Sequence, residues 1–365
     1  MNFDYSDDQK LLKDEARKFL AAHCGSGRVR AVLDDADNAY DVDLWKAVSA
    51  QGWLGAAIPE EFGGLGLGHI ELCAIAEELG RACAPIPFAS TVYFVAEALM
   101  LYGTDTQKVR WLPRIAAGEI IGAFATSEGA GPVTARSIRN TVSGSKLTGE
   151  KIPVTDGDVA DLIVVLARDG LYLVEQGAGV TADVLETLDP TRSAARLTFT
   201  DAPCEKLGTD DGIAAMQALF DRAAVLLAFE QLGGADRCLD MAKGYALDRY
   251  AFGRQIGGYQ AIKHKLADIY VKNELARSNA YYGAWALHAG AAELPLAAAT
   301  ARVAASDAYW FASKENIQTH GGMGFTWESD CHLYYRRSRQ LALVAGSPAA
   351  WRERLVGQLE TRNAA

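Results

Sequence analysis

Several patterns that define common protein classes are missing from this sequence. Its 365 residues include six cysteines and six histidines, and none of them forms a C-x-x-C or an H-E-x-x-H spacing. Because such spacings are typical of zinc sites, we expect no bound metal. Scattered cysteines of this kind indicate small buried apolar side chains in a reducing cytoplasm, not a disulfide framework.

Positive charge is also scarce. The 46 Asp and Glu residues outnumber the 36 Lys and Arg residues, which gives a net charge of -10. This balance argues against a surface for nucleic acid or anionic membrane. The first residues are polar and acidic, unlike a signal peptide, and we expect no apolar run long enough to span a bilayer. The length predicts two or three domains.

Glycine, in contrast, is plentiful, and three glycines lie within four residues in the segment QTHGGMGFTWE at residues 318–328. An alanine-rich stretch without glycine or proline, residues 297–317, precedes it and is expected to be helical. Glycine permits positive φ and lets a ligand approach the bare backbone. Such a corner suits a flat aromatic cofactor or a pyrophosphate. A helix C-cap followed by a tight turn explains the same pattern without any ligand.

The first 118 residues have a helical pattern. Ser6 and Gln9 have capping-box spacing at the start of a helix over residues 2–20. Further helices are expected over 44–50, 70–79, 90–102 and 104–117, with Gly80 ending the helix over 70–79. The glycine-rich loop at 52–68 does not match a dinucleotide fingerprint, because its last glycine would fall on His69 and no strand leads into it.

From residue 119 to 209 the pattern changes to short apolar or β-branched runs, at 162–166, 171–174 and 195–200. The connections are too short for crossover helices, so we expect an antiparallel barrel or sandwich and not a Rossmann domain. From residue 210 onward long helices are expected over 226–245, 260–289, from Pro295, and over 348–360, with Ser347 as N-cap of the last. This predicts an α+β chain of three domains, namely helices (1–118), a β domain (119–209) and a four-helix bundle (210–365).

Six motifs occur in a characteristic order. They are PEEFGG at 59–64, YGTDTQK at 102–108, TSEGAG at 126–131, GEKIPVT at 149–155, RYAFGRQI at 249–256, and the glycine corner at 318–324. Together with the domain order, they resemble the acyl-CoA dehydrogenase family over nearly the whole chain.

The resemblance implies an FAD-dependent enzyme that takes a proton from Cα of an acyl-CoA thioester while hydride leaves Cβ for flavin N5. Thr126 and Thr155 would hydrogen-bond the isoalloxazine ring. Arg249 would meet the pyrophosphate, because a guanidinium offers forked donors and a permanent charge. Without a ligand, Arg249 would serve only as a positive charge at the end of a helix. The remaining implied FAD contacts are Phe252 and Gln260 near the adenosine part, and Gln318, Gly321 and Gly322 on the FAD of a neighbouring subunit.

A site shared between chains implies an oligomer, either a homotetramer or an α2β2 heterotetramer with a related subunit. The resemblance also implies an electron-transfer flavoprotein or a similar acceptor as redox partner. Arg254, Arg336 and Arg337 are basic residues that could face the CoA phosphates, although surface arginines need no ligand.

The sequence departs from the family at the catalytic base. Most members place a glutamate shortly after the glycine corner, where this chain has Ala345. Others place it early in the first bundle helix, where this chain has Ala223. In the β domain, Pro153 stands in place of a flavin-stacking tryptophan and Pro132 in place of a serine.

One acidic residue lies in a suggestive place. Glu230 is in an apolar stretch two helical turns beyond Ala223, roughly 10 Å along the helix axis. Apolar surroundings raise the pKa of a carboxyl group, as suits a general base working near neutrality. The competing interpretation is a structural glutamate paired across the bundle, for example with Arg237 or a partner chain. Asp221 is expected to be a cap or an ion-pair member.

Three functions therefore stay open. In the first, the chain is an active acyl-CoA dehydrogenase with a relocated base, and Ala223, Ala224 and Ala345 widen the pocket for a bulky acyl group. Alternatively, it is the non-catalytic subunit of a hetero-oligomer and completes a partner's FAD site. The sequence looks similar to the paired subunits of bacterial steroid degradation. A flavin oxidase or monooxygenase on the same fold is the third possibility.

Overall fold

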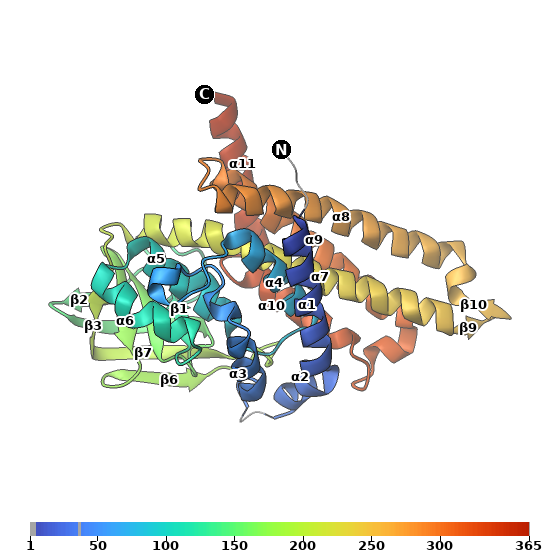
Figure 1. Cartoon of the computed structure of the whole chain (residues 1–365), viewed down its shortest axis with the longest axis horizontal. Helices are drawn as coiled ribbons and strands as arrows, with labels where there is room; N and C mark the ends of the chain where they lie inside the picture. Colours follow the sequence, from blue (N-terminus) through green and yellow to red (C-terminus); the bar gives the residue numbers. More distant parts are fainter. Residues whose placement is uncertain (1–4, 36–37, 365) are drawn as a thin grey trace. The chain divides into compact units, whose positions relative to one another are not determined.

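The computed structural model describes residues 5–35 and 38–364 of the chain (Figure 1). Contacts divide the chain into two compact units, which we name by their content. The helical unit comprises residues 1–26, 73–84 and 224–365, and the sheet unit comprises residues 27–72 and 85–223. The helices α4 (His69–Arg81) and α7 (Gly212–Asp248) each contribute to both units.

The helical unit is built around α9 (Leu294–His320), which packs against α8 (Gln260–His288), α10 (Cys331–Leu343) and α11 (Pro348–Ala364). Its first helix, α1 (Asp7–His23), has the predicted capping box, in which Ser6 and Gln9 bond each other's backbone N–H groups. Residues 2–4 of the helix predicted there lie outside the described residues. The predicted Pro295 in the first turn of α9 and the Ser347 cap of α11 are both confirmed.

Gly80 does not end its helix as predicted, because α4 continues to Arg81. A Cβ atom at Gly80 would lie 1.8 Å from the carbonyl oxygen of Glu230, and one at Gly233 would lie 1.7 Å from that of Glu77. The two glycines therefore let the backbones of α4 and α7 pack directly against each other. A sequence pattern cannot distinguish such a packing glycine from a helix stop.

The helix α7 also corrects an expectation about membranes. By length and composition it is apolar enough to cross a bilayer, although the sequence was expected to hold no such run. Of its most apolar window, 67% is buried inside the protein, as in the core helix of a globular fold. The helix ends before a small hairpin, β9 (Tyr250–Ala251) and β10 (Arg254–Gln255), and the 3-10 turn η4 (Ile256–Gly258) leads into α8.

The sheet unit contains two four-stranded sheets (Figure 1). The first has the order β1 (Gly122–Ala125), β4 (Leu162–Ala167), β5 (Gly170–Glu175), β8 (Glu205–Lys206). The second has the order β2 (Thr141–Ser143), β3 (Lys146–Thr155), β7 (Ala194–Pro203), β6 (Val180–Val184). Its helical elements are α2 (Ser26–Leu33), α3 (Val42–Ala50), η1 (Trp53–Gly55), η2 (Glu60–Phe62), the π-helix η3 (Ala89–Ala96), α5 (Glu97–Tyr102) and α6 (Asp105–Ala116).

Two details of the β prediction change. Among the described residues the strands form two separate sheets and not a closed barrel, so the sandwich alternative holds. The pair β1 and β4 is parallel, whereas antiparallel pairing was expected. The chain between them forms β2 and β3 in the other sheet, which provides the long connection that a parallel pair needs. All six residues of β4 are buried and contribute alternately to two cores, which explains its unbroken apolar sequence.

Candidate functional site

The glycine corner follows the end of α9. Gly321 has a φ of 62° and begins the 3-10 turn η5 (Gly321–Phe325). Gln318, Gly321 and Gly322 are exposed. A Cβ at Gly321 or Gly322 would meet no described atom within 4 Å. The backbone of this corner is therefore open to close approach by a large ligand.

The second predicted FAD segment lies at the tip where α7 and α8 join (Figure 1). Arg249 and Gln260 are exposed at the two ends of this segment. Phe252 is 97% exposed and has a φ of 49°, in the two-residue turn of the hairpin. Left-handed backbone and exposed aromatic surface are both unfavourable in an isolated chain. Such a residue is typical of a binding surface.

The structure brings these two segments together. The ring of Tyr245, one turn before Arg249, stacks on that of His320, with ring centroids 4.3 Å apart. His320 directly precedes Gly321. The hairpin and the glycine corner therefore lie at the same end of the helical unit. They present a guanidinium, an aromatic ring, an amide side chain and bare backbone. This set of groups fits a dinucleotide such as FAD.

Thr126 and Thr155, the two residues predicted to bind the flavin ring, belong to the sheet unit, at the ends of β1 and β3. Both are half-buried. The Lys151 ammonium donates to the Thr126 carbonyl oxygen at 3.2 Å and to Glu128 at 2.8 Å. Burial lowers the pKa of Lys151, against the opposing effect of Glu128. This ion pair holds the segment that carries Thr126 against β3, the strand on which Lys151 lies.

Two exposed prolines in the same region fit a flavin ring less well. Pro153 follows a cis peptide bond, and Pro132 lies in the loop after Thr126. Neither can supply the aromatic stacking or the hydroxyl group that the family uses there. The sheet unit therefore lacks two of the ring contacts, whereas the helical unit carries the full set implied for the far half of FAD.

The two usual base positions differ in their surroundings. Ala223 on α7 is 0% exposed. Ala345 is half-buried in a turn after α10, with a φ of 60°. Its carbonyl oxygen accepts a hydrogen bond of 3.0 Å from the Trp351 indole, and that of Val344 accepts one of 2.8 Å from Arg302. The turn is thus firmly held although it carries no carboxylate.

Glu230 is 4% exposed and lies 3.9 Å from the guanidinium of Arg337. Arg337 is itself 0% exposed and donates to the Ala84 carbonyl oxygen, so it is not a surface arginine for CoA. Burial lowers the pKa of the neighbouring Arg302 to about 9, while the charge of Glu230 acts to raise it. Glu230 therefore compensates buried positive charge. Asp221 is also buried.

Sequence reasoning missed a second buried carboxylate. Glu97 of α5 is 0% exposed and accepts from His69 Nε2 at 2.6 Å and from Arg222 Nε at 2.5 Å. Burial would raise the pKa of Glu97, but His69 and Arg222 lower it below its ordinary value. We call these three residues the Glu97 cluster. The only signal in the sequence is one acid inside the apolar run FVAEALML.

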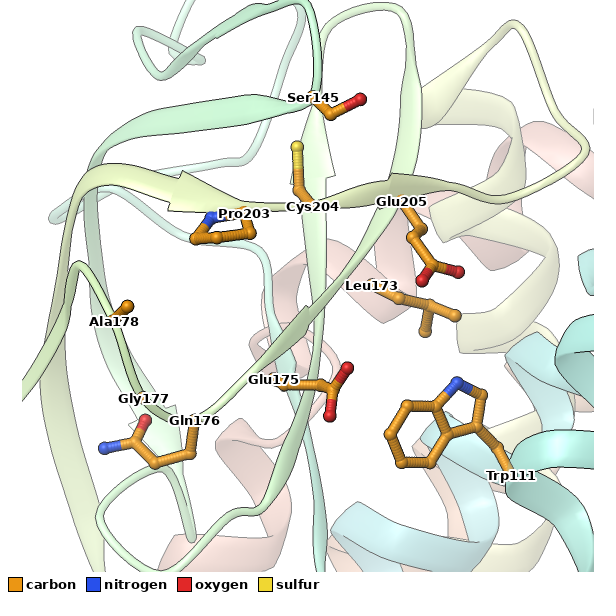
Figure 2. A pocket seen from close by; sticks show the side chains of 10 residues that line it. All are labelled: Trp111, Ser145, Leu173, Glu175, Gln176, Gly177, Ala178, Pro203, Cys204 and Glu205. Carbon is orange, nitrogen blue, oxygen red and sulfur yellow. The ribbon is translucent and has the colours of Figure 1, made fainter.

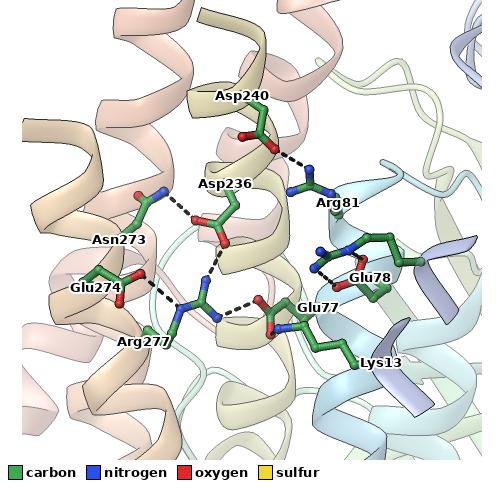
Figure 3. A network of polar contacts seen from close by, with 10 residues as sticks. Lys13, Glu77, Glu78, Arg81, Asp236, Asp240, Asn273, Glu274 and Arg277 are labelled. Carbon is green, nitrogen blue, oxygen red and sulfur yellow. Dashed lines mark hydrogen bonds and ion pairs between the residues drawn. The ribbon is translucent and has the colours of Figure 1, made fainter. Parts of the chain in front are cut away.

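Figure 3 shows a larger polar network in the helical unit. Arg277 of α8 binds Glu77 at 2.6 Å and also Asp236, which accepts from Asn273 at 2.9 Å. Lys13 of α1 binds Glu77 at 2.5 Å. Further pairs are Arg17 with Glu78, and Arg81 with Asp240. The network joins α1, α4, α7 and α8, so it serves the packing of these helices.

A pocket of about 410 Å³ lies in the sheet unit (Figure 2). It is located where the chain passes at Cys204 from the second sheet to the first, and Trp111 of α6 lines it. Arg110 bridges the rim carboxylates of Glu175 and Glu205. None of the predicted site residues lines this pocket. Among the described residues, no group of His, Cys, Asp and Glu side chains is placed to hold a metal ion.

The fold and the open corner define the class of FAD-dependent acyl-CoA oxidoreductases. The chain belongs to the acyl-CoA dehydrogenase family. The family's N-terminal domain model matches residues 6–119, and its C-terminal domain model matches residues 210–358. Members are oxidoreductases acting on CH–CH donors, and FAD is their cofactor.

Three relatives illustrate the match. The acyl-CoA dehydrogenase IpdE2 of Mycobacterium tuberculosis is 36% identical over 97% of this chain and 98% of its own length. The solved steroid acyl-CoA dehydrogenase Tcur3481–Tcur3483 is 30% identical, with a TM-score of 0.90 over 98% of this chain and 99% of that one. The ChsE4–ChsE5 complex of M. tuberculosis is 26% identical, with a TM-score of 0.89 over 99% of each chain.

Proposed function

We propose that this chain is the non-catalytic subunit of a heteromeric acyl-CoA dehydrogenase and that it completes the FAD site of a related partner subunit. The observation that carries the proposal is the lack of a carboxylate at either of the two usual base positions. Alanine occupies both usual base positions, and the nearby Glu230 is buried against Arg337. The partner supplies the carboxylate that takes the Cα proton.

The surroundings of Glu230 argue against a role as the base. A general base must reach the proton it abstracts, directly or through one water molecule. Glu230 is closed off from solvent, and its carboxylate lies beside the buried guanidinium of Arg337. Removing its charge would leave Arg337 buried without this counter-ion. These contacts support the structural role.

The helical unit supports the cofactor role. Arg249 would bind the FAD pyrophosphate through charge-assisted hydrogen bonds, and Phe252 and Gln260 would contact the adenosine part. Gln318, Gly321 and Gly322 would hold the FAD whose ring lies in the partner. When bound, FAD supplies the hydride acceptor for Cβ. The residues of this chain only bind and orient it.

The relatives support a specific assembly and a specific class of substrate. The steroid acyl-CoA dehydrogenase and the ChsE4–ChsE5 complex each combine two differently named chains. We infer an α2β2 assembly with a related subunit, a bulky acyl group as in steroid breakdown, and an electron-transfer flavoprotein or similar acceptor, all in the cytoplasm.

A visible absorption spectrum tests the proposal. The chain purified alone is expected to lack the flavin band, and co-expression with a related neighbouring gene's product is expected to restore it. Anaerobic addition of acyl-CoAs, including steroid thioesters, should then bleach the band equally in the wild-type complex and in Glu230→Gln. Bound flavin in the chain alone that bleaches with an acyl-CoA, and no longer does so in Glu230→Gln, would establish an active dehydrogenase with Glu230 as its base. Rapid reoxidation in air would instead indicate an oxidase or monooxygenase.

A further inference from the structure

The pocket of the sheet unit lies where β8 separates from β5. The two strands pair only through Tyr172 with Lys206 and Leu173 with Glu205. One residue before β8 the chain is bound elsewhere, because the backbone N–H of Cys204 donates to the Ser145 carbonyl oxygen at 2.9 Å. The gap between this run of chain and the end of β5 is the pocket, and the loop at 176–178 forms its other side (Figure 2). All its lining residues belong to the sheet unit.

Trp111 brings an unused hydrogen-bond donor to this pocket. Its side chain is 3% exposed, and among the described residues its Nε1 atom has no hydrogen-bond partner. In Figure 2 the nitrogen edge of the indole faces Leu173 and Glu205. Buried Trp N–H groups usually find a partner, because an unpaired buried donor is unfavourable. An unpaired donor beside a cavity therefore indicates a ligand with an acceptor atom.

The ring of Trp111 is already engaged by its own helix. The guanidinium groups of Arg110 and Arg114 lie over the indole, 4.4 and 5.1 Å from the ring centroid. Both distances are within the range of cation–π contacts. These contacts hold the ring in place, so the N–H is the group that Trp111 offers to a ligand.

The rim of the pocket carries excess negative charge. Glu175 and Glu205 are about half exposed, and Arg110 binds them at 2.5 and 3.0 Å. Two carboxylates and one guanidinium leave one negative charge uncompensated. None of the described residues that line the pocket is a lysine or an arginine. Such a rim repels phosphate groups and attracts a cation, so the pocket suits neither CoA nor FAD.

The inner wall of the pocket is apolar. Leu173 and Cys204 line it and are buried. Burial raises the pKa of the Cys204 thiol, so this side chain stays uncharged and acts as a small apolar group. The volume of about 410 Å³ is within the range of small-molecule sites. An apolar wall with a few polar groups at its edge is typical of such sites.

We propose that this pocket binds a small organic cation that carries a hydrogen-bond acceptor and an apolar group. The cation pairs with Glu175 and Glu205, and the acceptor oxygen receives the indole N–H of Trp111. The apolar group covers Leu173 and Cys204. The inference is independent of the proposed function, because none of the predicted FAD contacts lines the pocket.

NMR of the tryptophan indole N–H groups in the full-length chain tests the inference. The chain has seven tryptophans, and the signal that is missing in Trp111→Phe identifies Trp111. The probe is L-leucinamide, which combines a primary ammonium, a carbonyl oxygen and a branched apolar side chain. We expect L-leucinamide to move the Trp111 signal downfield in a saturable way, because its N–H gains an acceptor.

Two related molecules separate the contributions. Isocaproamide keeps the carbonyl oxygen and the apolar group but has no ammonium, so it should bind about two- to fivefold more weakly, as expected for an exposed ion pair. Leucine adds a carboxylate that the rim repels, and it should bind more weakly than L-leucinamide. The preference for L-leucinamide should decrease as the salt concentration rises.

Glu175→Gln should weaken L-leucinamide binding about two- to fivefold and leave isocaproamide binding unchanged. Glu150→Gln is the matched control. Glu150 is also about half exposed and paired with an arginine of the sheet unit, Arg196, but it does not line the pocket. This comparison follows whichever indole signal responds, so it remains decisive if Trp111→Phe does not fold.

Three results would overturn the inference. They are an indole spectrum that L-leucinamide leaves unchanged, equal affinities for L-leucinamide and isocaproamide, and equal effects of Glu175→Gln and Glu150→Gln. Each of them would leave the proposed function standing, because no step of the test involves flavin. Flavin reduction by the chain alone would overturn the proposed function and leave this inference standing.

Discussion

The end of the helical unit that carries the hairpin and the glycine corner, and the surroundings of the Glu97 cluster in the sheet unit, are built in opposite ways. At the first, Arg249, Phe252, Gly321 and Gly322 are exposed, and a Cβ at either glycine would meet no described atom within 4 Å. At the second, Phe94, Glu97 and Ala223 are buried. The first region therefore exposes polar groups and bare backbone, whereas the second encloses its charged groups in a core.

The difference separates two requirements of a shared active site. Binding a dinucleotide needs exposed backbone, a cation and an aromatic surface, and these groups work for whichever chain holds the reacting ring. Chemistry needs a carboxylate beside an empty space. A chain that offers the dinucleotide-binding groups but has no carboxylate beside an empty space can complete the FAD site of another chain. It need not contain an active site of its own.

The largest effect is expected from Glu97→Ala. The substitution leaves Arg222 and His69 facing each other without their carboxylate, and breaking a buried ion pair in this way costs about 3–5 kcal/mol. The free energy of unfolding from urea titration should fall by that amount. Glu97→Gln, which keeps the shape and an acceptor oxygen, should lose less. A loss below about 1 kcal/mol in Glu97→Ala would show that this cluster does not hold α5 to α7.

Arg249→Ala should weaken FAD binding without lowering the free energy of unfolding. Losing charge-assisted hydrogen bonds to a pyrophosphate is expected to cost about 1.5–3 kcal/mol, or roughly 10- to 150-fold in FAD affinity. Flavin retained after dialysis of the assembled complex measures the effect. Arg254→Ala is the control, because Arg254 stacks on Tyr259 of its own chain, 3.9 Å from the ring centroid. Equal flavin loss in both variants would remove the special role of Arg249.

Acid should weaken the two units through different carboxylates. Burial raises the pKa of Glu77, but Lys13 and Arg277 lower it below its ordinary value, and the pKa of Glu97 is also lowered. A lowered folded-state pKa contributes stability that is present above the unfolded pKa of about 4.3 and is lost as the pH falls through the folded value. The melting temperature should therefore drop below about pH 4.5, and less steeply in Glu77→Gln than in the wild type.

Asp236, in the same network, has the opposite effect on how folding stability depends on pH. Burial raises its pKa, against the effect of Arg277. Its contribution is fully present below an unfolded pKa of about 3.9 and is lost as the pH rises through the folded value. Asp236→Asn should thus show a steeper acid loss than the wild type. If Glu77→Gln and Asp236→Asn showed the same dependence of melting temperature on pH, this network would not determine how the protein responds to acid.

The sequence alone predicted much of this architecture. The capping box of Ser6 and Gln9, Pro295 and Ser347 are local signals. Each was confirmed because the helix end it marks depends on neighbouring residues only. The family motifs predicted the FAD chemistry for a related reason, since a motif keeps its residues within a short span. The parallel pair β1–β4 was missed because strand pairing depends on long-range packing.

The candidate site was harder to predict. Glu230 has the neighbours in sequence that a raised-pKa base would have, but Arg337 lies about a hundred residues away and compensates it in the fold. The Glu97 cluster joins three segments and has no motif at all. A buried carboxylate in an apolar run indicates that a partner exists, but not whether that partner is a substrate or an arginine.

The smallest effect, and the finest test of the proposed FAD contact at the glycine corner, is expected from Gly322→Ala. A Cβ there meets no described atom within 4 Å, and Gly322 does not have a positive φ, so folding stability should change by less than about 0.5 kcal/mol. The added methyl group would instead stand where FAD approaches the backbone, and flavin retention in the complex should fall. Gly357→Ala is the matched control, because it also adds a methyl group in open space, on α11. Unchanged flavin retention in Gly322→Ala would mean that the cofactor does not press on this corner, and the open end would then be a surface for the partner protein rather than for FAD.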